Sequence, residues 1–395
     1  MLALGWPLFG QAKTNDLPYS CEGYPSVLGQ GLPAWEWISP SVRLSSALQN
    51  VSFSQTKPIL GTALIDMGQG STLYFYSSSE LGNTYIANRV TRDGGMSWSQ
   101  ERKVLALSDS KAMAPSVLKT RDGVLHLFFI GYKKHEWRNG EPTPNDRSDL
   151  WTSRSFDHGI TWSKPNLIYR GYTGSTNGAI ETQSGTIIVP FSHYVSSPGR
   201  LVARVAVSKN GGEEWFFGAF VDIGGAGDHD GAMEPTVAEI ASKQILMLIR
   251  TRRGYLWQAL SNNLGETWSK ISPTRISSAE APANMLKTTD DRFFVVWNPR
   301  QDSMSELLDS DVNNHAIERM LAGRKELRLS EFFLDDQQNI RLGTELFVAQ
   351  GAHVTYPTIV QQDGDFWLAF QDVSLGWRQV KVVIAKIDHY RCALR

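Results

Sequence analysis

A short motif that recurs four times constrains the fold of this 395-residue chain more than any other feature. The motif has the form S/T-x-D/N-x-G-x-x-W, and its copies lie at Thr91–Trp98, Ser155–Trp162, Ser208–Trp215 and Ser261–Trp268. Asp or Asn caps a tight turn with its side-chain oxygen, and Gly accepts the positive φ that such a turn requires. We therefore expect each copy to form a hairpin turn whose Trp packs between neighbouring sheets.

Each copy of the motif is followed by a polar turn and then by a strongly apolar strand. These strands are Val124–Ile130, Thr186–Phe191, Ile245–Ile249 and Phe293–Trp297, and two more of the same kind are Thr72–Tyr76 and Phe366–Phe370. Six short strands that repeat about every 50 to 70 residues are typical of propeller blades with four strands each. We predict an all-β, six-bladed β-propeller with four-stranded antiparallel blades, in which residues 1–395 form one domain.

Composition narrows the classes of partner. The formal net charge is −1, which gives no electrostatic attraction to nucleic acid or to an acidic membrane. The sequence has no run of 18 apolar residues, so we expect no transmembrane span. It also has no nucleotide-binding Gly-rich loop after a strand, no HExxH and no CxxC pair, and we therefore expect neither an organic cofactor nor a metal.

The two cysteines, Cys21 and Cys392, lie near opposite ends of the chain. Because a propeller closes its ring by joining its first and last segments, we expect these residues to lie near each other. They are either two free thiols or a disulfide, and a disulfide would favour a secreted or periplasmic location over the cytoplasm. The apolar segment Leu2–Ala12 is either a short signal sequence or an N-terminal strand.

The repeated motif resembles the Asp-box, or BNR repeat, of the sialidases (neuraminidases), and the resemblance extends from about Thr72 to Ile387. It implies a propeller that carries a carbohydrate-cleaving pocket. In that family the Asp-boxes lie on the outer rim, away from the pocket, so the function must be argued from other residues.

Three further segments look like the active-site strands of the sialidases. The resemblance assigns Glu234 as the partner of the nucleophile, Arg250 and Arg324 as arginines that bind the substrate carboxylate, and Tyr356 as the nucleophile. These residue types suit a sugar with a carboxylate beside its anomeric carbon, because a neutral phenol avoids the repulsion that a carboxylate nucleophile would meet. Tyr needs a base, since its ordinary pKa is near 10, and planar guanidinium groups bind carboxylates bidentately.

Two features of the family pattern are missing. No Arg-Ile-Pro supplies a first arginine of the cluster, and Arg43 is the one Arg before Arg89. The loop that holds the acid/base Asp in the family here contains Glu80 as its single carboxylate. Arg328 is a second candidate for the position assigned to Arg324. The substrate is therefore left open between a sialic acid, another nonulosonic acid and a uronic acid.

A second group of residues suggests other functions. His229 and Asp230 lie just before Glu234 and are candidates for a general acid or base, and His193 ends an apolar strand. They suggest a polysaccharide lyase, or another glycosidase, that uses a His base on uronic-acid glycans. A non-catalytic glycan-binding propeller is a third hypothesis. A hydrogen bond between Tyr356 and Glu234 at the centre of the pocket favours the sialidase-type hydrolase.

Overall fold

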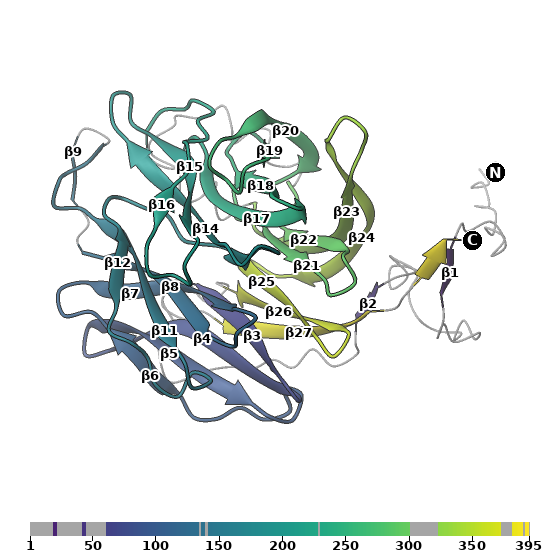
Figure 1. Ribbon diagram of the computed structural model, residues 1–395, viewed down its shortest axis with the longest axis horizontal. Coiled ribbons are helices and arrows are strands. Elements are labelled where there is room, and N and C mark those ends of the chain that lie inside the picture. The colour runs from purple at the N-terminus through teal and green to yellow at the C-terminus, as the bar shows by residue number, and fades with distance from the viewer. Residues whose placement is uncertain are drawn as a thin grey trace, which may run out of the picture.

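The computed structural model describes residues 61–133, 136–138, 141–227, 230–300, 323–372 and 381–389, together with the short strands at 19–21, 42–44 and 392–394. Within these ranges the chain forms β-strands and no helix. Six four-stranded antiparallel sheets follow one another around a central axis (Figure 1). The prediction of a six-bladed, all-β propeller is therefore confirmed for the described part of the chain. A search of the same residues finds no helical membrane span.

The first three blades follow chain order, and each blade runs from the axis to the rim. Blade 1 consists of β3 (Thr62–Gly68), β4 (Ser71–Glu80), β5 (Asn83–Thr91) and β6 (Arg102–Ala106). Blade 2 consists of β7 (Lys111–Lys119), β8 (Leu125–Tyr132), β11 (Ser148–Ser155) and β12 (Asn166–Tyr169), with a small hairpin of β9 (Trp137–Arg138) and β10 (Glu141–Pro142) between β8 and β11. Blade 3 consists of β13 (Ile180–Glu181), β14 (Ile187–Val195), β15 (Arg200–Ser208) and β16 (Phe216–Phe217).

The last three blades complete the ring. Blade 4 consists of β17 (Met233–Ala241), β18 (Gln244–Arg250), β19 (Tyr255–Ser261) and β20 (Ser269–Ser277). Blade 5 consists of β21 (Asn284–Lys287), β22 (Phe293–Trp297), β23 (Glu326–Leu334) and β24 (Ile340–Gln350). Blade 6 consists of β25 (Val354–Gln362), β26 (Asp365–Asp372), β27 (Lys381–His389) and the N-terminal strand β2 (Val42–Leu44).

Blade 6 closes the ring, because β2 comes from the start of the chain and pairs with β27 near its end. A separate two-stranded sheet joins β1 (Tyr19–Cys21) to β28 (Cys392–Leu394), and its register places Cys21 opposite Cys392. The expected proximity of the two cysteines is therefore confirmed. Their oxidation state stays a prediction, and Leu2–Ala12 lies outside the described residues.

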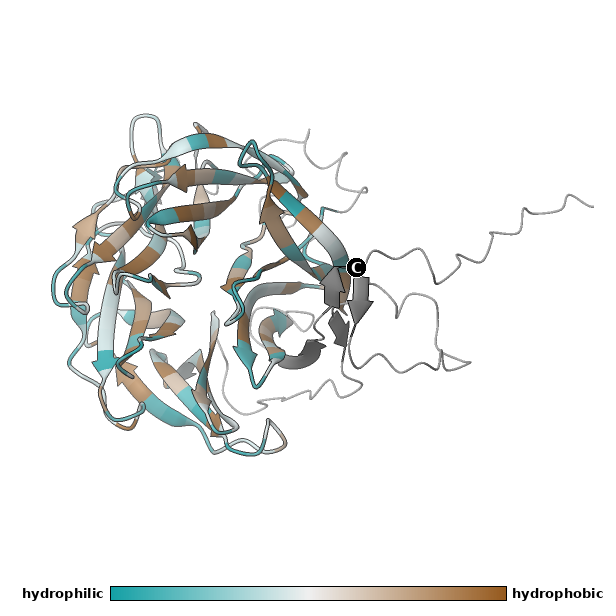
Figure 2. Cartoon of the chain, turned by 45° about the vertical axis from the view of Figure 1, so that its right-hand side comes forward, coloured by the Kyte–Doolittle hydropathy of each residue, from teal (hydrophilic) through white to brown (hydrophobic). Residues whose placement is uncertain are grey.

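Hydrophobic residues recur along the strands of the blades, as the brown stretches in Figure 2 show, and buried apolar clusters lie between adjacent blades. The cluster between blades 1 and 2, for example, contains Phe75, Leu127 and Phe129, all fully buried. Trp162, from the cleanest copy of the repeated motif, packs against this cluster with its ring edge-on to Phe75. The inter-sheet position expected for the motif tryptophans is confirmed, and this packing stabilises the ring that positions the site.

The turn of the repeated motif has the expected hydrogen bonds. In the second copy, the carboxylate of Asp157 accepts from the Ser155 hydroxyl and from the backbone N–H of Thr161, each at 2.8 Å. The Ser155 hydroxyl in turn accepts from the N–H of Gly159, which has a φ of 80°. The motif is thus a self-contained structural turn, and it contributes no side chain to the site described below.

Candidate active site

Three inner strands share a local irregularity at their N-terminal ends. In blades 2, 4 and 6 the residue before a proline has a positive φ, and the pairing with the next strand is interrupted there. These residues are Ala114 (53°), Glu234 (31°) and Tyr356 (51°). A bulge of this kind re-aims a side chain out of the regular ladder. The three segments share the sequence x-Pro-(Ser/Thr)-(Val/Ile), in which x is Ala114, Glu234 or Tyr356. This shared sequence is the local reason that Glu234 and Tyr356 meet near the axis.

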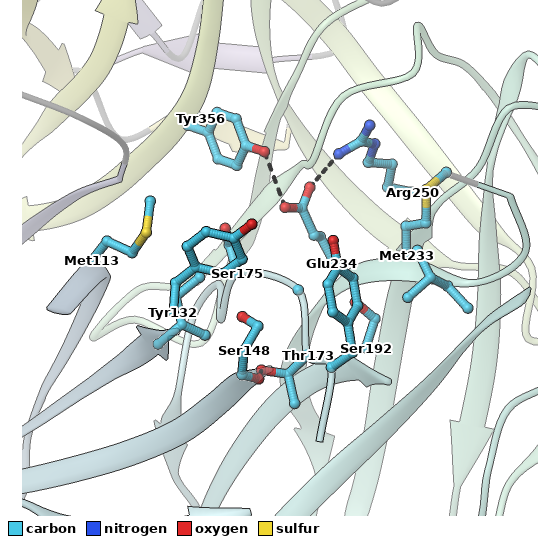
Figure 3. A pocket seen from close by; sticks show the side chains of 14 residues that line it. Met113, Tyr132, Ser148, Thr173, Ser175, Ser192, Met233, Glu234, Arg250 and Tyr356 are labelled. Carbon is cyan, nitrogen blue, oxygen red and sulfur yellow. Dashed lines mark hydrogen bonds and ion pairs between the residues drawn. The ribbon is translucent and has the colours of Figure 1, made fainter. Parts of the chain in front are cut away.

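Tyr356, Glu234 and Arg250 form one connected group (Figure 3). The hydroxyl of Tyr356 donates to Oε1 of Glu234 at 3.0 Å. Nη1 of Arg250, at the C-terminal end of β18, donates to the other oxygen, Oε2. Glu234 is 7% exposed and Arg250 is 3% exposed. Tyr356, which is 122 positions from Glu234 in the chain, therefore shares this buried carboxylate with Arg250.

Glu280, which lies between β20 and β21, joins this group, and sequence reasoning missed it. Its Oε1 accepts from Nη2 of Arg250 at 3.3 Å, and its Oε2 lies 4.0 Å from Nε of Arg252. Its backbone carbonyl accepts from Nε and Nη2 of Arg324, at 3.1 and 2.7 Å. The signal that points to Glu280 is its place shortly before the inner strand of blade 5, since Glu234 and Tyr356 lie at the start of the inner strands of their own blades.

Arg324 is completely buried beside Tyr356, with its guanidinium carbon 5.5 Å from the centre of the Tyr356 ring. Nη1 of Arg324 and Nε of Arg250 are buried and have no hydrogen-bond partner among the described residues. Unpaired buried donors are costly and rare in folded proteins. Two of them on neighbouring guanidinium groups are consistent with a site that receives an anionic ligand.

Burial and neighbouring charges set the protonation states of Glu234, Tyr356 and Arg324. Burial opposes ionisation of Glu234, but Arg250, with Arg324 and the hydrogen bond from Tyr356, outweighs it and holds the pKa of this carboxyl below its ordinary value. Burial, reinforced by Glu234, raises the pKa of Tyr356. Burial, reinforced by the neighbouring Arg250, lowers the pKa of Arg324 to about 10. At neutral pH the group therefore holds a neutral phenol, an ionised Glu234 and two guanidinium cations.

A cavity of about 270 Å³ opens beside this group. Glu234, Arg250 and Tyr356 line one side of it, where Figure 3 draws them above the serines and threonines. The remaining wall is partly apolar and partly hydroxylated, and it consists of Met113, Ile130, Tyr132, Ser148, Tyr172, Thr173, Gly174, Ser175, Ser192, Leu201 and Met233. Within the described part of the chain, Glu234 is the single carboxylate of this lining.

The other acidic candidates lie elsewhere. Asp230 does not line the cavity, and its carboxylate accepts from the backbone N–H groups of Ala226 and Gly231 within its own loop. Glu80 is exposed at the end of the β4–β5 hairpin. The structure therefore does not bring either carboxylate together with Tyr356 and Glu234.

Neither His193 nor Arg328 lines the cavity. His193 follows the cavity-lining Ser192, but its ring packs against Tyr169 and Phe220, and burial and Arg204 lower its pKa to about 4. Arg328 forms ion pairs with Glu326 and Glu345. His229 and the side chain of Arg43 lie outside the described residues. In the described ranges, no group of three or more His, Cys, Asp or Glu side chains is arranged to hold a metal ion.

Comparison with solved structures places this fold among known propellers. A protein of unknown function from Dyadobacter fermentans matches with a TM-score of 0.69 at 15% identity, over 89% of this chain and 100% of its own. The NanB sialidase from Streptococcus pneumoniae matches with a TM-score of 0.62 at 12% identity, over 87% of this chain and 70% of its own. The intramolecular trans-sialidase from Ruminococcus gnavus matches with a TM-score of 0.60 at 14% identity, over 87% of this chain and 97% of its own.

These likenesses concern the fold, because the identities are low. No curated protein matches the sequence. The family model described as "BNR repeat-like domain" matches residues 73–368, which is most of the chain. The chain therefore belongs to the BNR repeat-like domain family, with a sialidase-like propeller fold.

Proposed function

We propose that this protein is an exo-acting, retaining glycoside hydrolase that removes a terminal acidic sugar, a sialic acid or a related sugar, from a glycan. The observation that carries the proposal is the 3.0 Å hydrogen bond from the Tyr356 hydroxyl to Glu234 at the edge of the cavity. A nucleophile in contact with its base is the arrangement that covalent catalysis requires. The sialidase activity in the names of the structural neighbours agrees with this proposal.

In the first step the Tyr356 oxygen attacks the anomeric carbon and forms a glycosyl–tyrosine bond. The glycosidic bond breaks, and its electron pair leaves with the aglycone oxygen. Glu234 takes the phenolic proton as the bond forms, because the raised pKa of Tyr356 keeps the free phenol protonated at neutral pH. In the second step water attacks the same carbon and releases a proton to the solvent, while Glu234 returns its proton to the departing Tyr356 oxygen. The anomeric configuration is retained.

Arg250 and Arg324 bind the carboxylate of the sugar in this proposal. Each has a buried N–H without a partner in the described structure, and guanidinium groups form strong charge-assisted bonds with carboxylates. A phenol suits this environment as a nucleophile, since it carries no charge that would repel the substrate carboxylate. An anionic ligand would also satisfy donors that are otherwise buried and unpaired.

The leaving oxygen needs a proton when the aglycone is a poor leaving group. Asp230 and Glu80, the acids proposed from the sequence, are not part of the described cavity lining. The aglycone of an aryl glycoside is a good leaving group and departs without such a proton. We therefore choose aryl glycosides as the first substrates, because they test Tyr356 and Glu234 independently of the acid.

The test is a screen of aryl glycosides of sialic acids, other nonulosonic acids and uronic acids, with Tyr356→Phe measured beside the natural protein. We expect hydrolysis of an acidic glycoside, and a loss of about 10³-fold or more in kcat for Tyr356→Phe. Tyr85→Phe is a matched control, because Tyr85 also donates to a carboxylate, that of Glu101 at 2.7 Å, but does not line the cavity. Its kcat should equal that of the natural protein.

Unchanged hydrolysis by Tyr356→Phe would remove the nucleophile from the mechanism. A product with a new carbon–carbon double bond, together with loss of activity in His229→Ala, would support the lyase instead. Binding of acidic glycans without any turnover would support a non-catalytic propeller.

A further inference from the structure

The backbone of Tyr356 is held in an unusual conformation. Its φ of 51° lies in the left-handed region, which a bulky residue seldom adopts, and Pro357 follows it. The register of β25 with β26 passes from Thr355 directly to Thr358, so neither Tyr356 nor Pro357 has a partner on β26. A conformation of this kind persists only where surrounding contacts enforce it.

One of these contacts comes from the neighbouring blade. The hydroxyl of Thr62, the first residue of β3, donates to the backbone carbonyl of Tyr356 at 3.1 Å, across 294 positions of sequence. Thr62 is 8% exposed. The bulge leaves Tyr356 without a paired residue on β26, and the Thr62 hydroxyl holds its carbonyl from the neighbouring blade.

Thr62 is itself fixed from its other side. Gly61 precedes it with a φ of 84°, and a Cβ atom at that position would lie 2.5 Å from Cα of Ala114 on β7. The start of β3 is therefore pressed against blade 2 while its first hydroxyl binds blade 6. The strand cannot move away from Tyr356 without disturbing blade 2.

We infer that Thr62 is a positioning residue for the nucleophile: its hydroxyl fixes the Tyr356 carbonyl, and thereby the direction in which the phenol meets Glu234. The inference rests on the proposed function of Tyr356. Thr62 lines a separate cavity of about 730 Å³ between the inner strands of the six blades and does not line the candidate cavity. It therefore acts through Tyr356 and not on the substrate. Because this hydrogen bond links blade 6 to blade 1, the same contact helps to close the ring and to place the nucleophile.

The experiment compares Thr62→Val and Thr62→Ser with Thr72→Val. Valine keeps the shape of threonine and removes the hydroxyl, whereas serine keeps the hydroxyl. Thr72 is the matched control, because its buried hydroxyl also joins blade 1 to blade 6, through Gln362, but at the far end of β25 from Tyr356. Each variant is assayed for kcat, KM and thermal stability on the aryl glycoside that the natural protein cleaves.

We expect Thr62→Val to lower kcat by about tenfold to a hundredfold with KM changed less than about threefold, since small misplacements of a reacting group are expensive in rate. Thr62→Ser should stay within about threefold of the natural kcat, and Thr72→Val should lose stability but keep kcat. Equal kcat values in the two valine variants would overturn the inference. A Thr62→Val chain that does not fold would also overturn it, because Thr62 would then hold the ring and not the nucleophile in particular. Failure of the proposed function is distinguished separately, by unchanged activity in Tyr356→Phe.

Discussion

The two arginines of the candidate site should differ in their response to replacement by methionine, which has a similar length and no charge: Arg250→Met should destabilise the fold, and Arg324→Met should leave its stability nearly unchanged. Arg324 is buried, and its pKa falls well below the ordinary value of an arginine, to about 10. At about 1.4 kcal/mol for each pKa unit, folding disfavours the charged form by about 3 kcal/mol. The pKa of this base is lower in the folded than in the unfolded state, so the destabilisation is complete below about pH 10 and disappears only as the pH rises from there to the pKa of the unfolded chain.

The Arg324→Met change also removes favourable contacts. It leaves the Glu280 carbonyl without two donors, at a cost of about 1–3 kcal/mol, and removes the guanidinium from the Tyr356 ring, worth about 0.5–2 kcal/mol. These losses are about as large as the gain from removing the buried charge. We therefore expect the free energy of unfolding to change by less than about 1.5 kcal/mol.

Arg250→Met has no such compensation. Arg250 binds both Glu234 and Glu280, whose side chains are each 9% exposed. Removing one partner of a buried ion pair typically destabilises a protein by about 3–5 kcal/mol, because the remaining charge is left unpaired. The two variants should thus differ in stability by about 3 kcal/mol, although each loses an arginine that binds Glu280.

Urea denaturation at pH 7 measures the two free energies of unfolding, and initial rates on the acidic aryl glycoside measure the activities. Both variants should lose most of kcat/KM, since each removes a proposed ligand of the sugar carboxylate. Equal destabilisation by the two substitutions would refute the assignment of Arg250 as the structural counter-ion. An Arg324→Met variant with normal kcat/KM would refute the role of Arg324 in binding.

Two further predictions concern the carboxylates. Glu234→Gln should lower kcat by about 10²- to 10⁴-fold through loss of the base. Because the pKa of Glu234 is depressed in the folded state, its charge stabilises the fold above about pH 4.3. The difference in the free energy of unfolding between natural protein and variant, measured by urea denaturation, should therefore become smaller as the pH falls below that value. Asp157→Ala should lower the melting temperature without changing kcat, whereas Asp157→Asn should keep the turn, as Asn210 does at the same motif position, where its side-chain oxygen accepts from the N–H of Glu214 at 3.0 Å. Hydrogen bonds from Thr161 lower the pKa of Asp157 to about 2, so natural protein but not Asp157→Asn should lose stability from this turn as the pH falls from about 4 to 2, and a change in kcat in either variant would contradict a purely structural motif.

Local chemistry made much of the fold predictable. The repeated turn needs only residues within eight positions of each other, and the apolar strands that follow it are buried whatever their neighbours are. The number of repeated units predicts the number of blades, because each unit forms one sheet. The sheets stack side by side, because each must bury both of its faces. The resemblance to sialidases added Glu234, Arg250, Arg324 and Tyr356, which the structure brings together.

The parts of the site that were missed depend on side-chain direction and on long-range register. Adjacent residues of a strand point to opposite faces, so Ser192 lines the cavity and His193 does not. Glu280 has no motif of its own, and the contact of Thr62 with Tyr356 joins the first blade to the last. Such contacts become visible only when the ring is closed. The extent of the domain over residues 1–395 stays a prediction.

Covalent trapping tests the central claim most directly. A fluorinated glycosyl fluoride of the acidic sugar that the protein cleaves should form the glycosyl–enzyme bond quickly and release it slowly. Intact mass spectrometry followed by peptide mapping should then find one sugar attached to the peptide that contains Tyr356, and no adduct in Tyr356→Phe. A sugar attached to any other residue, or rapid turnover of the natural substrate with inverted configuration, would contradict the account.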